Sequence, residues 1–145
     1  MTLEGYKHGI PTSLWNKARA EVRTVLIKYA SGRQTVPYST LVRLIKTIRL
    51  HQHDDWLFNM LWEISTREYT DGRGMLSVVV VRKSGRQLPG GGFFELAASL
   101  GKNISNRHRC WWDEFNRVCD HWSNLAKSEK VVKRRAARKK SKRKS

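Results

Sequence analysis

The sequence has little that would suit a membrane-spanning or secreted protein. No apolar run in its 145 residues approaches the ~20 residues that cross a bilayer. The first ten residues, MTLEGYKHGI, lack the basic and apolar regions of a secretory signal. Two cysteines, Cys110 and Cys119, are too few for a disulfide framework and suit a reducing compartment. We therefore expect a cytoplasmic protein, long enough for one domain with an appendage.

Acids are also scarce, with 12 Asp and Glu against 29 Lys and Arg, which gives a formal net charge of +17. This imbalance exceeds what solubility requires, and it is typical of chains that neutralise phosphate groups. Nucleic acid is therefore the first partner to consider, and an anionic membrane surface is the second. A nucleoid-associated or ribonucleoprotein-associated location would follow from the first.

The familiar catalytic motifs are missing as well. The order GxxxxGK[ST] of a phosphate-binding loop is absent, and GGGFFE at residues 90–95 does not match the dinucleotide pattern GxGxxG. Lys83 has no acid two residues before it, which disfavours the (D/E)xK design of metal-dependent nucleases, and Ser77 stands in no GxSxG turn. We therefore favour a non-enzymatic protein without a cofactor. The acids that a test for catalysis should change are Glu63, Glu68, Asp71 and Glu95.

Two clusters of potential metal ligands are better explained without a metal. The first consists of His108, Cys110, Cys119 and His121. Its two cysteines lie nine residues apart in one predicted helix. They are thus separated by roughly 13 Å, whereas tetrahedral zinc needs ligands about 2 Å from one point. The second cluster, at a turn between helices where Asp is expected as a cap, consists of His51, His53, Asp54 and Asp55. We predict no metal site.

Apolar residues recur at helical spacing in five segments after an N-terminal arm of residues 1–11. Capping residues, glycines and prolines bound several of them. The predicted helices run from about Thr12 to a stop at Gly32, Pro37 to Arg49, Asp54 to Tyr69, Phe93 to Leu100, and Cys110 to Leu125. Six tryptophans fall mostly on the apolar faces of these helices, and we expect Trp62 and Trp112 to be the most exposed.

Residues 71–101 hold the only convincing strand and the only glycine-rich loop. Met75 to Val81 is a nearly unbroken apolar run rich in β-branched residues, which is typical of a strand covered on both faces. Arg82 to Gly92 is basic and glycine-rich and predicts a projecting loop or wing. Helix, turn, helix, strand and basic loop is the order of a winged helix-turn-helix. We therefore predict a mostly helical α+β domain with one core strand or a small sheet, and winged helix-turn-helix-like geometry as its finer form.

The last part of the chain differs sharply in composition. Residues 127–145 contain 11 Lys and Arg and the single acid Glu129, which leaves a net charge of +7 for residues 1–126. Like charges at this density repel one another and predict disorder in the isolated chain. The expected organisation is a compact domain at 1–126 and a disordered basic tail at 127–145.

The core stretch also carries a resemblance. Residues 72–101, GRGMLSVVVVRKSGRQLPGGGFFELAASLG, resemble a pattern in small uncharacterised bacterial proteins. In that pattern a strand after Gly-Arg leads through a Pro-Gly loop into a Gly-Phe-Phe-Glu-Leu-Ala helix. The resemblance covers about one fifth of the chain. It implies a bacterial or phage origin and no particular activity.

The first functional hypothesis is a nucleic-acid-binding protein that contacts phosphates, with duplex DNA favoured over RNA. Clustered Lys and Arg gain affinity for a phosphate backbone by releasing its counterions, and glycines let a backbone approach phosphate closely. The predicted contacts on the second helix and the loop are Arg43, Lys46, Arg49, Arg82, Lys83 and Arg86. Those in the tail are Lys130, Lys133, Arg134, Arg135, Arg138, Lys139, Lys140, Lys142, Arg143 and Lys144.

Two alternatives stay open at this point. The same charges suit an RNA-binding protein or an accessory subunit of a ribonucleoprotein. They also suit a protein interaction module whose aromatic surface binds a larger nucleic-acid enzyme while the tail guides the assembly.

Overall fold

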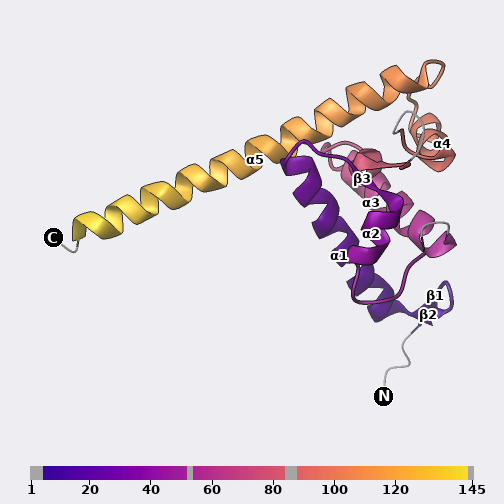
Figure 1. Cartoon of the computed structure of the whole chain (residues 1–145), viewed down its shortest axis with the longest axis horizontal. Helices are drawn as coiled ribbons and strands as arrows, with labels where there is room; N and C mark the ends of the chain where they lie inside the picture. The colour runs from indigo at the N-terminus through magenta and orange to yellow at the C-terminus, as the bar shows by residue number, and fades with distance from the viewer. Residues whose placement is uncertain (1–4, 52–53, 84–87, 144–145) are drawn as a thin grey trace.

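The computed structural model describes residues 5–51, 54–83 and 88–143. Helices dominate, and four very short strands form two pairs (Figure 1). The elements in chain order are β1 (Tyr6–Lys7), β2 (Ile10–Pro11), α1 (Thr12–Ser31), β3 (Val36–Pro37), α2 (Tyr38–Leu44), α3 (Asp55–Thr70), the 3₁₀ helix η1 (Leu76–Val79), β4 (Val80–Val81), α4 (Gly91–Ser99) and α5 (Arg107–Arg143). A mostly helical α+β fold is therefore confirmed.

The N-terminal arm forms a hairpin that lies against α1 and α3. β1 and β2 pair antiparallel through a two-residue turn, in which His8 and Gly9 both have positive φ, as the tight hairpin turns require. The carbonyl of His8 accepts a hydrogen bond of 2.9 Å from Nε1 of Trp56 on α3, and Lys7 pairs with Glu63. These contacts fix the start of α1 beside the start of α3.

The centre of the core is η1, on which α1, α3 and α5 all pack. The predicted strand from Met75 to Val81 is wrong for its first part, because Leu76–Val79 form a 3₁₀ helix and the strand β4 consists of Val80–Val81. The burial of this run was predicted correctly, because every residue from 75 to 81 is at most 7% exposed. The run is apolar because α1, α3 and α5 bury η1 between them, and burial by helices does not require a sheet.

Side chains of the surrounding helices hold the η1 backbone in place. Glu114 accepts a hydrogen bond of 2.9 Å from the backbone N–H of Met75, and Ser65 accepts one of 2.9 Å from that of Ser77. Nε1 of Trp111 donates to the carbonyl of Val78 over 2.9 Å. Buried backbone groups must find partners, and here they find side chains in place of a neighbouring strand. This explains why a strand-like sequence does not form a strand.

The second helix is shorter than its periodicity predicts. α2 ends at Leu44, and Ile45 is already extended. The N–H groups of Lys46 and Thr47, which would continue the helix, donate instead to Oε1 of Glu21 on α1, over 2.8 and 2.9 Å. Lys46 and Arg49 therefore do not extend a basic helical face from Arg43. The expected single face is replaced by a short helix and an irregular segment.

The finer winged helix-turn-helix geometry is not confirmed. β4 pairs with β3 in parallel, with Val36 opposite Val80, whereas a wing is an antiparallel hairpin. The tip of the predicted wing, including Arg86, lies outside the described residues. The third helix does begin as predicted, because the carboxylate of Asp54 accepts a hydrogen bond of 3.1 Å from the N–H of Trp56.

The last helix departs most from expectation. The predicted disordered tail is instead a continuation of α5 to Arg143, and Figure 1 shows this half projecting far from the domain. Residues 127–143 contain no glycine or proline, and Lys, Arg and Ala are among the best helix formers. The costly first turn is already formed by the packed part of the helix, around Val118 and Trp122, so each further residue adds to an existing helix.

Candidate nucleic-acid interface

The predicted phosphate contacts fall into three groups on different elements. The α5 group is the largest, and its described side chains, which include Lys130, Arg134 and Arg138, are all exposed. Every residue from 127 to 139 is exposed, and this part of α5 projects away from the domain (Figure 1). We call residues 127–143 the basic arm. Lys140, Lys142 and Arg143 belong to it by their backbone, and Lys144 lies outside the described residues.

The second group consists of Arg82 and Lys83, which directly follow β4. Both side chains are exposed, and neither forms an ion pair within the described part of the chain. Both line a surface cavity of about 1020 Å³ together with Gly90 and Gly92 at the start of α4. The loop and the glycines that the sequence singles out thus lie around one hollow.

The third group is smaller. Arg43 and Arg49 line a shallower cavity of about 660 Å³, which His51 also borders. Lys46 is exposed but does not line it. The loss of the continuous helix therefore leaves two of the three predicted cations close together and places the third beside them.

The larger cavity has a polar corner. The N–H of Gly90 donates a hydrogen bond of 2.9 Å to the hydroxyl of Tyr38, and a Cβ added to Gly90 would lie 3.9 Å from Nε of Arg82. Burial raises the pKa of Tyr38, and the Gly90 hydrogen bond and the charge of Arg82 only partly offset this effect. The hydroxyl therefore stays protonated at neutral pH and keeps a proton that it can donate.

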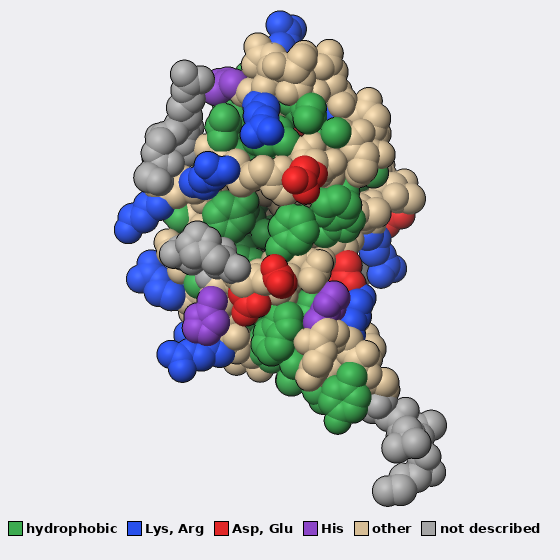
Figure 2. All heavy atoms as spheres, turned by 90° about the vertical axis from the view of Figure 1, so that its right-hand side faces the viewer, with side chains coloured by type: hydrophobic (Ala, Val, Ile, Leu, Met, Phe, Trp, Pro, Cys, Tyr) green, Lys and Arg blue, Asp and Glu red, His purple; other side chains and the backbone are tan. Residues whose placement is uncertain are grey.

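The opposite wall of this cavity is aromatic. Phe58 and Trp62 on α3 lie with their ring centroids 5.7 Å apart, and Phe93 of α4 also borders the space. A Cβ on Gly92 would lie 2.0 Å from Phe58, so only glycine lets α4 approach α3 this closely. Figure 2 looks onto this face and shows hydrophobic side chains gathered at its middle, with acidic, basic and histidine side chains around them.

Sequence reasoning missed Phe58 and Tyr38 as parts of a site. A signal for Phe58 was present, because Phe58 and Trp62 are spaced i, i+4 and lie off the face formed by Leu57, Met60 and Ile64. Two large aromatic residues on the non-core side of a helix indicate a second apolar surface. Nothing in the sequence indicated that Arg82 and Lys83 would line the same cavity as this surface.

The acids proposed for a catalytic test are mostly held by basic residues. Glu63 accepts hydrogen bonds from Nε1 of Trp15 over 2.9 Å and from Arg19 over 3.1 Å, in addition to its pair with Lys7. Burial tends to raise the pKa of Glu63, but these hydrogen bonds and the Lys7 charge outweigh it and lower the pKa. Its carboxylate is thus a structural anchor.

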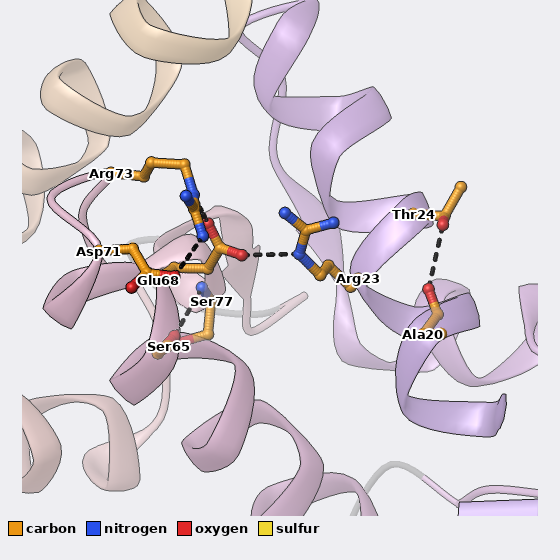
Figure 3. Close-up of polar contacts among 8 residues, drawn as sticks. All are labelled: Ala20, Arg23, Thr24, Ser65, Glu68, Asp71, Arg73 and Ser77. Atoms are coloured by element: carbon orange, nitrogen blue, oxygen red, sulfur yellow. Dashed lines mark hydrogen bonds and ion pairs between the residues drawn. The ribbon is translucent and has the colours of Figure 1, made fainter. Parts of the chain in front are cut away.

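Glu68 is held more tightly still, as Figure 3 shows. It is 2% exposed and lies between Arg73, with which it pairs directly, and Arg23, whose Nε donates over 2.6 Å. Burial raises the pKa of Glu68, and the two arginine hydrogen bonds outweigh that effect and lower it. Arg73 also pairs with Asp71 over 2.9 Å. These carboxylates face arginines and do not converge on an open site.

The other reactive side chains also have structural partners. The hydroxyl of Ser77 accepts a hydrogen bond of 2.5 Å from Ser65, and both serines are buried. Cys119 is fully buried and Cys110 is half-buried on the same helix, and both are free thiols. Within residues 5–51, 54–83 and 88–143, no three His, Cys, Asp or Glu side chains are close enough to hold a metal ion. His53 lies outside these ranges.

No family model, curated protein or solved structure matches the chain. Among the described helices, none combines the length and apolar character that a bilayer crossing needs.

Proposed function

We propose that this protein is a non-enzymatic nucleic-acid-binding protein whose main contact is the basic arm on duplex DNA. The observation that supports the proposal is the arm itself, a helix that projects from the domain with every residue from 127 to 139 exposed. Within 127–145, 11 Lys and Arg stand against one acid. A polyanion supplies the neutralising charge that such a helix lacks by itself.

The helical form of the arm favours duplex DNA over duplex RNA. At 1.5 Å per residue, residues 127–143 extend roughly 25 Å, which is less than one turn of B-DNA. The major groove of B-DNA admits an α-helix, whereas that of A-form RNA is deep and too narrow for side chains to read. The arm resembles in this respect the continuous basic helices that cross a major groove. A winged helix-turn-helix placement of α3 is not needed for this contact.

The test is a comparison of the full chain with a truncation that lacks Lys130 to Ser145. If about six of the arm's charges engage phosphates, truncation should flatten the slope of log K against log salt by roughly five, at ~0.9 per contact. The thermal midpoint should change little, because the arm is exposed and buries almost no apolar surface. Anisotropy titrations with labelled duplex DNA over a series of salt concentrations give the slope.

A matched variant separates the helix from its charge. Ala136→Pro keeps every Lys and Arg but interrupts the arm, because proline removes a helical hydrogen bond and clashes with the preceding turn. We expect it to weaken duplex binding at constant salt. Binding that is unaffected by both the truncation and the proline would refute the proposal.

A protein partner is the second candidate for this helix. Leu125, Val131 and Val132 are exposed to 42%, 46% and 65%, and exposed apolar side chains on a helix are typical of a docking face. Co-purification at high salt, where phosphate contacts are screened, would identify such a partner.

A further inference from the structure

The larger cavity combines two features that the sequence suggests separately. Its aromatic wall, Phe58 and Trp62, belongs to α3, and its cationic corner, Arg82 and Lys83, follows β4. Aromatic side chains stack on unpaired bases, and Lys and Arg contact the phosphates that link them. The fold brings both kinds of group to one hollow, so a ligand with an aromatic ring and a phosphate satisfies the whole cavity.

The aromatic wall is not explained by the core. Phe58 is 42% exposed and lines the cavity, whereas the apolar residues Leu57, Met60, Leu61 and Ile64 of the same helix are buried. Leaving a phenyl ring at this exposure forgoes burial that would stabilise the fold. A flat, apolar ligand that covers Phe58 and Trp62 would recover it.

The charges around the cavity limit the ligand further. Arg82 and Lys83 contribute two positive charges to the lining, and Asp54 and Asp55 contribute two negative ones. The two cations of the described lining suit the single negative charge of a phosphodiester. Asp54 is already engaged in capping α3, whereas the exposed Asp55 can accept a hydrogen bond from a base N–H.

We infer that this cavity binds one unpaired nucleotide of a nucleic acid, with the base against Phe58 and Trp62 and its phosphate at Arg82 and Lys83. The inference rests on the proposed function in so far as the ligand is a nucleic acid. The contact proposed for the cavity differs from that of the arm, because the arm binds the phosphate backbone whereas the cavity binds an unstacked base.

The cavity and the basic arm face different directions. Figure 2 views the cavity face from the right-hand side of Figure 1, whereas the arm projects toward the left of Figure 1. One short oligonucleotide therefore cannot occupy both. This separation allows each site to be tested alone in the full chain.

The experiment measures binding of a labelled single-stranded DNA pentanucleotide to the full chain at elevated salt, where backbone contacts of the arm are weakened. Phe58→Ala should raise the dissociation constant about tenfold, which corresponds to the loss of one stacked base. Arg82→Ala with Lys83→Ala should also weaken binding. Irradiation should crosslink the bound DNA to the tryptic peptide 50–67, which contains Phe58 and Trp62.

Two matched controls separate base recognition from charge and from general exposure. An abasic pentamer with the same phosphates should bind about tenfold more weakly than the normal one. Trp112 is an exposed aromatic residue outside the cavity lining, 49% exposed on α5, and Trp112→Ala should bind like the unchanged protein. The thermal midpoint of Phe58→Ala, a partly exposed position, checks that the fold persists.

Equal affinity of Phe58→Ala and the unchanged protein, equal binding of the abasic pentamer, or a crosslink only within the arm would each overturn the inference. The result of the arm truncation on duplex DNA does not depend on the result for the cavity. A normal salt slope on duplex DNA with no effect of Phe58→Ala would overturn the cavity alone, and the reverse result would overturn the arm alone.

Discussion

Replacement of Glu68 by glutamine should strongly destabilise the protein. Glu68 joins α3 to α1 through Arg23 and to the following loop through Arg73. The guanidinium of Arg23 also lies over the ring of Trp122, with its central carbon 5.6 Å from the ring centroid, so the interaction extends to α5. One carboxylate thus connects three of the helices that surround η1.

The expected magnitude follows from burial. Breaking a buried ion pair by removing one partner costs about 3–5 kcal/mol. Arg23 and Arg73 keep 40% and 28% of their side-chain surface, so water can solvate them after the change and the cost should lie near the lower end, about 3 kcal/mol. Urea unfolding followed by tryptophan fluorescence measures the free energy of unfolding. Glu95→Gln, on the exposed side of α4, is the control and should change it by less than about 0.5 kcal/mol.

The effect of Glu68→Gln should also depend on pH. The folded-state pKa of Glu68 is lowered, so the folded protein binds fewer protons there than the unfolded chain does. The stabilisation is present above the unfolded pKa of about 4.3 and is lost as the pH falls through the folded pKa. The two proteins should therefore converge in stability in acid. A difference below about 1 kcal/mol at neutral pH, or one that stays constant down to pH ~2, would refute this account of Glu68.

Two further outcomes are expected. Burial raises the pKa of the Cys119 thiol to about 11, so at pH ~8 only about one such thiol in a thousand is ionised and Cys119 should resist alkylation by iodoacetamide. The half-buried Cys110 should react first. Equal alkylation rates of the two cysteines, measured by mass spectrometry, would contradict this expectation. Gly74→Ala should lower the free energy of unfolding by about 3 kcal/mol, because φ is +89° and the new Cβ would lie 2.8 Å from both Glu114 and Val118. Gly72→Ala, with φ of +84° and nothing within 4 Å of the new Cβ, should lower it by only about 1 kcal/mol. Similar losses for the two variants in urea unfolding would contradict the role of close packing at Gly74.

Local signals in the sequence predicted much of the fold. The periodicity of α1, the Asp54 cap of α3 and the glycine stop of α4 depend on residues close together in the chain. The errors occur where a distant side chain takes a backbone hydrogen bond. Glu21 ends α2 in this way, and Glu114 and Ser65 hold 75–79 out of a strand. A single sequence does not reveal such partners.

The candidate site follows the same division. The cations of the arm and of Arg82 and Lys83 were found from composition, since charge clusters are visible without a structure. Trp62 was expected to be exposed, but its place beside Phe58 in an aromatic wall was not predicted, because that wall depends on the approach of α4 to α3 at Gly92. The tail was predicted to be disordered from the repulsion between its charges alone, without the effect of the packed helix that precedes it.

The continuity of α5 also has a mechanical consequence. Its 37 residues form one uninterrupted helix of roughly 55 Å, which is packed into the domain at Val118 and Trp122 and is exposed at every residue from 127 to 139. No loop separates the packed part of α5 from the basic arm. When a partner binds the arm, the helix therefore fixes both the distance and the orientation of the domain relative to that partner. Each residue inserted near 126 would lengthen it by only about 1.5 Å but would turn the domain by about 100° around its axis.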